Sequence, residues 1–410
     1  MIGIDQHRER ILSVAHPLPA RRMPIDDTLG LVLAEDVTNR WPVPLFDNSA
    51  MDGYAVRVED AVDGARLRVV GDVPAGSSED PPVGRGEAVR IMTGAPVPTD
   101  ATAIVPVEHT DLGVFLSAEP PEEIVVTQAP VPGAHIRRRG EDAAAGSVVV
   151  AAGNTIGSWQ LSSIASAGRD AVLVHPAPRA AVISTGSELI APGATPQRGQ
   201  IPESNSRLLA AALRSAGAEV VHVATVPDDD EALRTELARL DADLVVLSGG
   251  ASVGAFDVVK SVLDGSGSAH TPVRFESVAM QPGKPQGFGV ADDGALLFCL
   301  PGNPVSVAVS FEMFVRPAVR ALAGHGELSR PVTVLPAGAD WRCPPGRAQV
   351  LPVVVRSGAV FPASAGGSGS HLVASLAQAS DLAIIPAETE RVQEGDPVTV
   401  MLVSETQVRA

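Results

Sequence analysis

Between about residues 177 and 325 the sequence alternates between two kinds of hydrophobic pattern. Short runs of β-branched and aliphatic residues, typical of buried strands, are separated by segments whose apolar residues recur every three or four positions, as in helices. Strands separated by helices pair in parallel, and the helices then cover both faces of the sheet. The pattern therefore predicts a three-layer α/β domain. The expected strands and helices are, in order, RAAVIST, SNSRLLAAALRSAG, AEVVHVATV, DDDEALRTELARL, ADLVVLSGG, AFDVVKSVLDG, VRFESVAM, ALLFCL and VSVAVSFEMFVRPAVRALAG.

The sequence on either side of this region has a different character, and the expected fold is multidomain α/β plus β. Residues 329–410 contain short β-rich runs between glycine, proline and serine, which favours a small C-terminal β-barrel domain. Residues 45–140 lack helical periods and carry many turn residues, so we expect an inserted β-rich domain. The segments 1–44 and 141–176 are expected to form one elongated N-terminal domain. The α/β domain then occupies residues 177–328.

Composition limits the partners and the location of such a chain. The formal net charge is −17, and so acidic a surface repels the phosphates of nucleic acids and of anionic lipids. No run of about 18 apolar residues is present, as a membrane span would need, and the start of the chain lacks the continuous apolar core of a secretory signal. We therefore expect a cytoplasmic protein with no nucleic-acid and no membrane partner. Cys299 and Cys343 are expected to be small hydrophobic side chains, and neither a disulfide nor a metal site.

Only two of the 31 basic residues are lysines, Lys260 and Lys284. Both lie in glycine-rich segments, whereas arginine is used everywhere else. An ammonium group is a compact charge that approaches a phosphate oxygen as a point donor, while the arginine fork favours planar contacts. The placement of the two lysines therefore indicates a local anion site on an otherwise acidic protein.

Four polar, glycine-bearing segments follow the expected strands, and in an open α/β sheet ligands bind beyond the carboxyl ends of the strands. The segments are STGSEL (184–189), LSGGASVGAFDVVK (247–260), QPGKP (281–285) and LPGNPVS (300–306). Each alone has an ordinary explanation as a tight connection or a helix start. Together at one sheet edge, with both lysines among them, they predict a binding site for an anionic small molecule.

The segment 247–260 carries most of the expected phosphate-binding groups. Glycines let the backbone turn tightly and point its N–H groups at an anion, and the next helix adds its positive end. Asp257 and Lys260 are three apart on that helix and share a face, where the carboxylate can hold Mg²⁺ and the ammonium can neutralise phosphate. The spacing matches neither a P-loop nor a dinucleotide fingerprint. The substrate-binding residues expected here are Ser248, Gly249, Gly250, Ser252 and Gly254.

The other segments contribute a rigid turn and further carboxylates. In LPGNPVS the helix is expected to begin at Pro304 or Val305, after an N-cap asparagine. Glu188 is either an exposed surface residue or a contact to a metal or leaving group. Asp228 is either one of the acidic residues at the N-terminus of a helix or a residue of the site. The binding residues expected in the turn are Pro301, Gly302, Asn303 and Ser306.

In this order the motifs closely resemble those of one family, the molybdopterin molybdenumtransferases or MoeA proteins, whose eukaryotic relatives include the gephyrin E domain. The resemblance covers nearly the whole chain. One of these motifs alone would be weak evidence, but the ordered series is specific. The motifs are FDNSAMDGYAV (46–56), IMTGAPVP (91–98), IRRRGED (136–142), STGSEL, GQIPESNS, SGGASVG, PGKP, LPGNPVS and GSGSHL (367–372).

This resemblance implies the last step of molybdenum cofactor synthesis, in which adenylylated molybdopterin and molybdate give molybdenum cofactor and AMP. It implies an elongated homodimer of four-domain subunits that dimerise through the N-terminal domain, with an active cleft between the α/β domain of one subunit and the inserted β domain of the other. Molybdopterin adenylyltransferase and molybdoenzymes are further implied partners. The implied catalytic residues are Glu188, Asp228, Asp257, Lys260 and Lys284 on the α/β side and Asp52, Thr93 and Asp142 from the second subunit.

The expected roles follow from the chemistry of the implied reaction. Lys284, together with Lys260, offsets the charge of the phosphate-bearing substrate and of molybdate. Asp257 and Glu188 are the expected ligands of Mg²⁺, because hard carboxylate oxygens suit this ion, and the cation would polarise the scissile phosphoanhydride. No covalent protein nucleophile is needed.

Three positions depart from the family pattern, and other functions are compatible with part of the sequence. Gln281 stands where a lysine is common, Ser187 replaces an aspartate, and PESN replaces a tyrosine–aspartate form, so a preference for tungstate or a regulatory role stays open. Molybdopterin adenylyltransferase needs only the α/β domain, so the flanking domains favour the molybdenumtransferase. A non-catalytic gephyrin-like scaffold would not need the acidic and lysine residues. A sugar- or nucleotide-binding protein is the third alternative.

Overall fold

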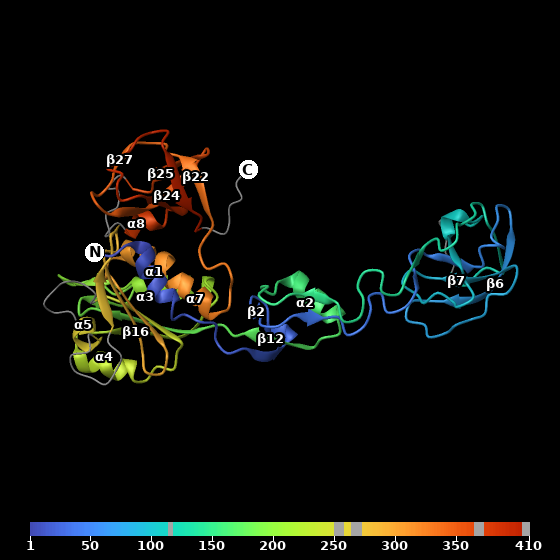
Figure 1. Cartoon of the computed structure of the whole chain (residues 1–410), viewed down its shortest axis with the longest axis horizontal. Helices are drawn as coiled ribbons and strands as arrows, with labels where there is room; N and C mark the ends of the chain where they lie inside the picture. Colours follow the sequence, from blue (N-terminus) through green and yellow to red (C-terminus); the bar gives the residue numbers. More distant parts are fainter. Residues whose placement is uncertain (114–117, 250–257, 264–272, 365–372, 404–410) are drawn as a thin grey trace.

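The computed structural model describes residues 1–113, 118–249, 258–263, 273–364 and 373–403. The molecule is elongated (Figure 1). An α/β domain with the C-terminal β module beside it lies at one end, a small module lies in the middle, and a second β module lies at the far end. Within these described ranges, no helix combines the length and the hydrophobicity needed to cross a lipid bilayer.

The α/β domain is built on a six-stranded sheet of order β16-β13-β17-β21-β20-β18. Neighbouring strands are parallel from β16 to β21, while β20 runs antiparallel to both of its neighbours. The sequence did not predict β20, because two glycines lower the strand propensity of PQGFGV. The strands are β13 (Arg179–Thr185), β16 (Glu219–Val226), β17 (Leu244–Ser248), β18 (Arg274–Ser277), β20 (Pro285–Val290) and β21 (Leu296–Leu300).

Helices cover both faces of this sheet. One face, with Val182 and Val246, packs against α1, α3, α6 and α7, and the other, with Ile183 and Leu247, packs against α4 and α5. Both faces of these strands are therefore buried, which explains their continuous apolar runs. The helices are α1 (Ile4–Leu12), α3 (Asn205–Ser215), α4 (Asp230–Leu237), α5 (Val258–Leu263), α6 (Pro304–Ser310) and α7 (Arg316–Leu322).

Two helices differ from the expected arrangement. The sequence from Val305 predicts one long helix, but a π-helical turn, η3 (Phe311–Val315), separates α6 from α7. Pro317 has no N–H to donate to the carbonyl four residues earlier, and the wider turn before it accommodates this. α1 packs against η3 and α7, so the first residues lie on the α/β domain, although the sequence grouped residues 1–44 with the middle module.

The middle module connects the two ends of the molecule. Its three-stranded sheet, of order β1-β12-β2, and the β3–β11 pair enclose a small apolar core that includes Ile164 of α2. Its elements are β1 (Arg21–Pro24), η1 (Ile25–Asp27), β2 (Val32–Leu33), β3 (Val37–Thr38), β11 (Val148–Val150), α2 (Ser158–Ser166) and β12 (Ala171–His175).

The β module at the far end contains a five-stranded sheet of order β8-β5-β7-β6-β9 and a separate β4–β10 pair. The only tyrosine of the chain, Tyr54, is fully buried in its core. Its elements are β4 (Asn48–Ser49), β5 (Gly53–Val56), β6 (Arg66–Val73), β7 (Glu87–Ile91), β8 (Ala103–Pro106), η2 (Val107–His109), β9 (Glu123–Val125) and β10 (Ile136–Arg137).

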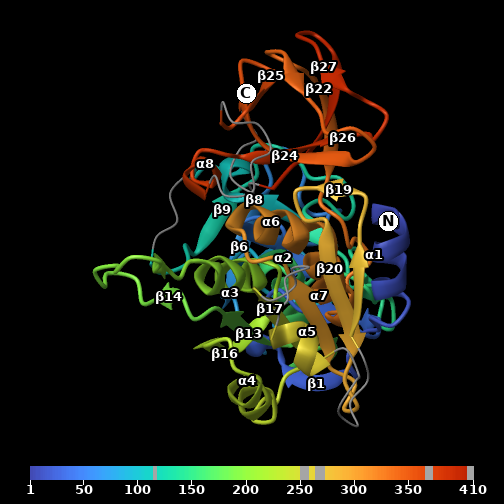
Figure 2. The ribbon, with the colours of Figure 1, turned by 90° about the vertical axis from the view of Figure 1, so that its left-hand side faces the viewer.

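The C-terminal module is a sheet of order β19-β24-β26-β28-β22, with β25 paired to β24. A bridge between Ala337 and Val360 also brings β25 next to the end of β22. β19 comes from the expected strand VRFESVAM, which is divided between two sheets, and it ties this module to the α/β domain (Figure 2). The elements are β19 (Met280–Gln281), β22 (Val332–Pro336), β23 (Trp341–Arg342), β24 (Ala348–Arg356), β25 (Ala359–Pro362), α8 (Val373–Leu376), β26 (Asp381–Ile385), β27 (Arg391–Val392) and β28 (Pro397–Met401).

Candidate functional site

The carboxyl ends of three neighbouring strands meet at one edge of the α/β sheet. Ser184 of β13 pairs with Ser248 of β17, and Ser248 pairs with Leu300 of β21. Three predicted segments, which begin at Ser184, Leu247 and Leu300, therefore leave this edge side by side, as predicted, and the second is described as far as Gly249. β20 runs in the opposite direction, so its first residue, Pro285, brings Lys284 to the same edge.

Two glycines let these segments approach each other closely. Gly249 has a φ of +96°, and a Cβ atom there would lie less than 3.0 Å from the backbone oxygen of Thr185. Gly302 faces it from the third segment, where an added Cβ would lie 3.5 Å from the Cα atom of Gly249. No larger residue fits at 249 without moving a backbone. The predicted residues Gly250, Ser252, Gly254 and Asp257 lie outside the described ranges.

A buried carboxylate that the sequence did not reveal lies beneath this edge. Glu203, just before α3, is 5 % exposed. Its Oε1 atom accepts hydrogen bonds from the Ser184 hydroxyl (2.9 Å) and the Ser206 N–H (2.7 Å), and its Oε2 atom accepts one from the Ser206 hydroxyl (2.6 Å). The Ser184 and Ser248 hydroxyls are 3.1 Å apart. These contacts join the start of α3 to the ends of β13 and β17.

Asn205 links α3 to the third segment. Its Nδ2 atom donates to the Gly302 carbonyl at 2.7 Å. Because a carbonyl only accepts, this contact fixes which way the amide faces. Across the described parts of the chain, the buried Oδ1 of Asn205 and the buried Oγ1 of Thr185 find no hydrogen-bond partner. Both atoms retain hydrogen-bonding capacity at the sheet edge.

Two exposed carboxylates adjoin the ends of β13 and β16. The Ser187 N–H donates to Asp228 Oδ2 and the Asp228 N–H donates to Ser187 Oγ, both at 3.0 Å. This reciprocal pair holds Asp228 beside the residue that precedes Glu188. The Glu188 carboxylate folds back over Gly186, where an added Cβ would lie 2.7 Å from its Oε2 atom.

Carboxylates such as those of Glu188 and Asp228 are suitable ligands for a divalent cation. Carboxylate oxygens suit Mg²⁺, which commonly keeps several waters and needs only one or two protein carboxylates. No cluster of three or more acidic, histidine or cysteine side chains suited to a metal occurs among the residues that the structure describes. As exposed carboxylates, Glu188 and Asp228 have the chemistry that suits a partly hydrated ion.

The remaining predicted residues of the α/β side lie at or near the same edge. Lys284 is exposed immediately before β20, and its carbonyl accepts the Val278 N–H at 2.7 Å. Lys260 is exposed on α5, which follows the glycine-rich segment. Asn303 occupies the N-cap position of α6 without a side-chain capping hydrogen bond. Pro301 and Ser306 are buried.

Two predicted residues of the inserted β module, Asp52 and Thr93, form a second group, and Asp142 follows this module in the chain. Asp52 and Thr93 are in direct contact, because the Thr93 N–H donates to Asp52 Oδ1 at 2.6 Å. Gly53 permits the tight packing of β5, since a Cβ atom there would lie within 3.0 Å of the Val105 backbone. Asp142 follows β10, and its N–H donates to the Val43 carbonyl at 3.1 Å.

Asp47 joins the motifs at either end of the β module. Its carboxylate accepts from the Arg139 N–H at 2.8 Å and from Arg138 Nη1 at 2.6 Å. These contacts, led by the backbone hydrogen bond, lower the pKa of Asp47. The β4–β10 pair and the bridge between Asn48 and Pro96 bring the motifs FDNSAMDGYAV, IRRRGED and IMTGAPVP together.

The two groups do not meet within one chain. The middle module separates the β module, which carries Asp52 and Thr93, from the α/β domain, which carries Glu188 and Lys284 (Figure 1). A site that uses both groups would require a second subunit.

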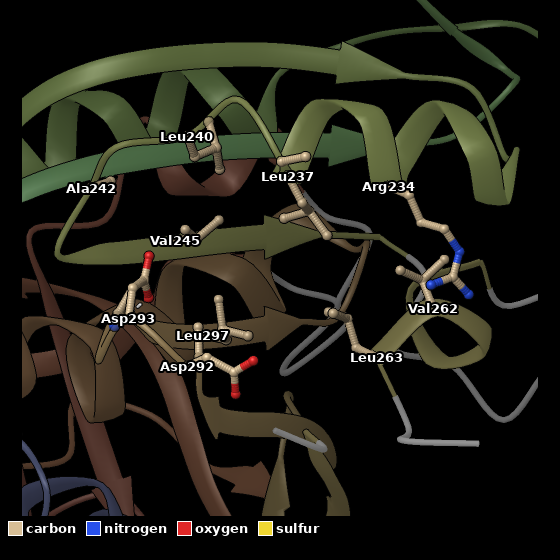
Figure 3. Close-up of a pocket in the computed structure, with 13 residues that line it drawn as sticks. Arg234, Leu237, Leu240, Ala242, Val245, Val262, Leu263, Asp292, Asp293 and Leu297 are labelled. Atoms are coloured by element: carbon tan, nitrogen blue, oxygen red, sulfur yellow. Dashed lines mark hydrogen bonds between the residues drawn. The ribbon is translucent and has the colours of Figure 1, made fainter. Parts of the chain in front are cut away.

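A pocket of about 570 Å³ lies at the other edge of the sheet (Figure 3). Ala242 and Ala295 line it just before β17 and β21, and Leu237 and Val262 contribute from α4 and α5. Its lining is mostly aliphatic, with Arg234, Asp292 and Asp293 as its charged residues. The pocket therefore lacks the glycine turns and lysines of the carboxyl edge, and it is a separate feature.

Comparison with known families agrees with the order of these modules. Three family models match consecutive parts of the chain: the MoeA N-terminal region, domains I and II, over residues 2–168; a probable molybdopterin binding domain over residues 181–321; and the MoeA C-terminal region, domain IV, over residues 334–403. Together they confirm the resemblance predicted from the motifs.

Individual proteins are similar over the full length. Molybdopterin molybdenumtransferase 2 of Mycobacterium tuberculosis is 43 % identical, over 98 % of this chain and 99 % of its own. The molybdopterin molybdenumtransferase of Haemophilus influenzae is 32 % identical, over 98 % of each. The crystal structure of a molybdopterin biosynthesis MoeA protein from Pyrococcus horikosii superimposes with a TM-score of 0.81 at 32 % identity, over 98 % of this chain and 99 % of that one.

Proposed function

The chain belongs to the MoeA family of molybdopterin molybdenumtransferases, and we propose that it inserts molybdate into adenylylated molybdopterin with release of AMP. The observation that carries this proposal is the single sheet edge at which three strand-end segments and Lys284 converge. An adenylylated pterin phosphate is an anion with two phosphoryl groups. Closely packed glycine turns and an exposed ammonium group offer the donors that such a substrate needs.

We propose that the working form is a homodimer with shared active sites. The separation of Asp52 and Thr93 from the α/β group supports this, because each subunit carries both halves but cannot join its own. The middle module exposes large apolar side chains, with Trp159 at 83 % and Leu29 at 65 %. Leu29 is next to Gly30, whose N–H donates to Ile156 just before α2, the helix of Trp159. A second copy of the chain would bury this surface.

The residues of the edge have distinct proposed roles. Lys284 and Lys260 would bind the phosphoryl and molybdate oxygens, and Asp52 and Thr93 of the second subunit would close the site over them. Glu188 and Asp257, with Asp228 as a further carboxylate, would hold Mg²⁺, which would supply charge neutralisation at the scissile phosphoanhydride. Ser187 would keep the Asp228 carboxylate oriented for this task, since the two residues exchange hydrogen bonds. The proposed compartment is the cytoplasm, where two cysteines outside any disulfide are usual.

The test is a reconstituted reaction. Purified chain is mixed with adenylylated molybdopterin, Mg²⁺ and molybdate, and AMP and active cofactor are quantified with and without molybdate. We expect molybdate-dependent AMP release. Its absence would reject the proposal, and adenylylation of molybdopterin from ATP would favour the adenylyltransferase instead. Binding of substrate without turnover, with or without molybdate, would favour a scaffold.

A further inference from the structure

The polar ends of β13 and β17 lie in line with the core on the α3 face of the sheet. Side chains alternate along a strand, so Ser184 continues the row of Val182 and Ser248 continues the row of Val246. Both serines are 1 % exposed. They are therefore interior groups at the base of the strand-end segments, and Gly249 follows one of them directly.

Glu203 is the acceptor for the Ser184 hydroxyl and for Ser206. Burying a carboxylate is unfavourable unless donors compensate for its lost hydration. The three donors to Glu203 are neutral groups of Ser184 and Ser206. An apolar side chain at position 203 could fill the core without this cost, so the buried carboxylate needs another explanation.

The direction of each hydrogen bond follows from donor counting. A carboxylate only accepts, so Ser184 uses its single hydroxyl hydrogen on Glu203. In the 3.1 Å pair between the two serines, Ser184 must then accept and Ser248 must donate. The hydrogen of Ser248 is therefore committed to the protein and is not offered to a ligand.

We propose that Glu203 is a positioning residue that sets the start of the glycine-rich segment through Ser184 and Ser248. The chain of hydrogen bonds fixes Ser248, and the N–H of the next residue, Gly249, donates to the Leu300 carbonyl at 3.3 Å. The aligned ends of the strand segments then receive the substrate, without a hydrogen from Ser248. This last step rests on the proposed function, whereas the positioning of Gly249 does not.

Two matched variants test the inference. Ser184→Ala and Ser206→Ala each remove one buried hydroxyl from the same carboxylate, at sites that are 1 % and 2 % exposed. Only Ser184→Ala cuts the connection to Ser248. Amide exchange of Gly249 is measured by mass spectrometry on peptides that cover β17, and KM for adenylylated molybdopterin is measured by AMP release.

We expect Ser184→Ala to speed Gly249 exchange by about ten-fold, and to raise KM by a similar factor, because Gly249 and the segments packed against it lose their alignment. Ser206→Ala should change both by less than about three-fold, while both variants lower Tm by similar amounts. Equal exchange rates in the two variants would overturn the inference. Absence of AMP release by the unmodified chain would reject the proposed function and leave the exchange comparison intact.

Discussion

Gly249 is subject to two constraints, a positive φ and a close contact with another segment. Substitutions at Gly249 and Gly217 distinguish between them. Its φ of +96° strains any other residue, and an added Cβ would meet the Thr185 backbone oxygen. Gly217, at the end of α3, has a φ of +97° but nothing within 4 Å of an added Cβ. We expect alanine at either position to lower the free energy of unfolding by about 1–3 kcal/mol. Only Gly249→Ala should reduce AMP release, by roughly ten-fold or more. Equal activity of the two variants would contradict a role for the close contact.

His325 makes the stability of the chain depend on pH. Burial, with smaller effects of Arg320 and Arg316, lowers its pKa from 6.5 to about 4. The unfolded chain binds this proton near pH 6.5 and the folded chain only near pH 4, so the free energy of unfolding falls as pH is lowered across that window. Asparagine can keep a nitrogen near Thr155 Oγ1, which lies 3.2 Å from His325 Nδ1.

The Tm of the His325→Asn variant should therefore fall less than that of the unmodified chain when the pH is lowered from 6.5 to 4. Burial also lowers the pKa of His7, so part of the slope will remain. Identical slopes in thermal melts would contradict the assignment.

Individual residues differ in how far their sequence context reveals them. The sequence singles out Lys284, Asp52 and Thr93, because a rare residue type and ordered motifs mark them. Glu203 and Ser184 could not. Their importance depends on which strands are neighbours, and β13 and β17 are joined only by the fold. A serine at the last interior position of an otherwise apolar strand was the one available signal.

A buried ion network connects η3 to the beginning of the C-terminal module. Glu312 of η3 contacts Arg330 at 3.0 Å and Arg316 at 3.9 Å, and all three side chains are at most 10 % exposed. Glu312→Gln should lower the free energy of unfolding by about 3–5 kcal/mol, because it removes the negative charge from a buried ion pair. Arg57→Ala, which breaks an exposed pair with Glu59, should lower it far less, because solvent screens that pair. Chemical denaturation of both variants compares them, and equal losses would refute the argument.

Strands and helices could be predicted where the hydrophobic pattern is strong. They could not be predicted where three-dimensional packing decides the bounds of the element. β13, β17 and β21 are uninterrupted apolar runs and were anticipated. β20 was missed because Gly287 interrupts its pattern. That glycine is needed because a side chain would meet Phe275 and Cys299 within 3.0 Å. The helix after Asn303 was predicted as one piece, since the effect of Pro317 on the preceding turns is a property of three-dimensional hydrogen bonding.

If two subunits share each site, dimers that combine two different variants should regain activity. Asp52→Ala removes one half of a site and Asp228→Ala removes the other, so each pure variant should be inactive. Random mixing gives half heterodimers, each with one intact site of two, and AMP release should recover to about a quarter of the unmodified level. Subunit exchange is verified by mass spectrometry. No recovery after confirmed exchange would exclude a site built from two subunits.

The chain enters and leaves the β module at the same place. Val43 bridges Ala143, and the Asn39 N–H donates to the Ser147 carbonyl while the Gly146 N–H donates to the Asn39 carbonyl. A segment of about a hundred residues thus begins and ends at adjoining points of its host, the geometry that domain insertion requires. In genetic terms the module is a cassette: its coding sequence can be exchanged for that of a relative without altering the reading of the remaining chain.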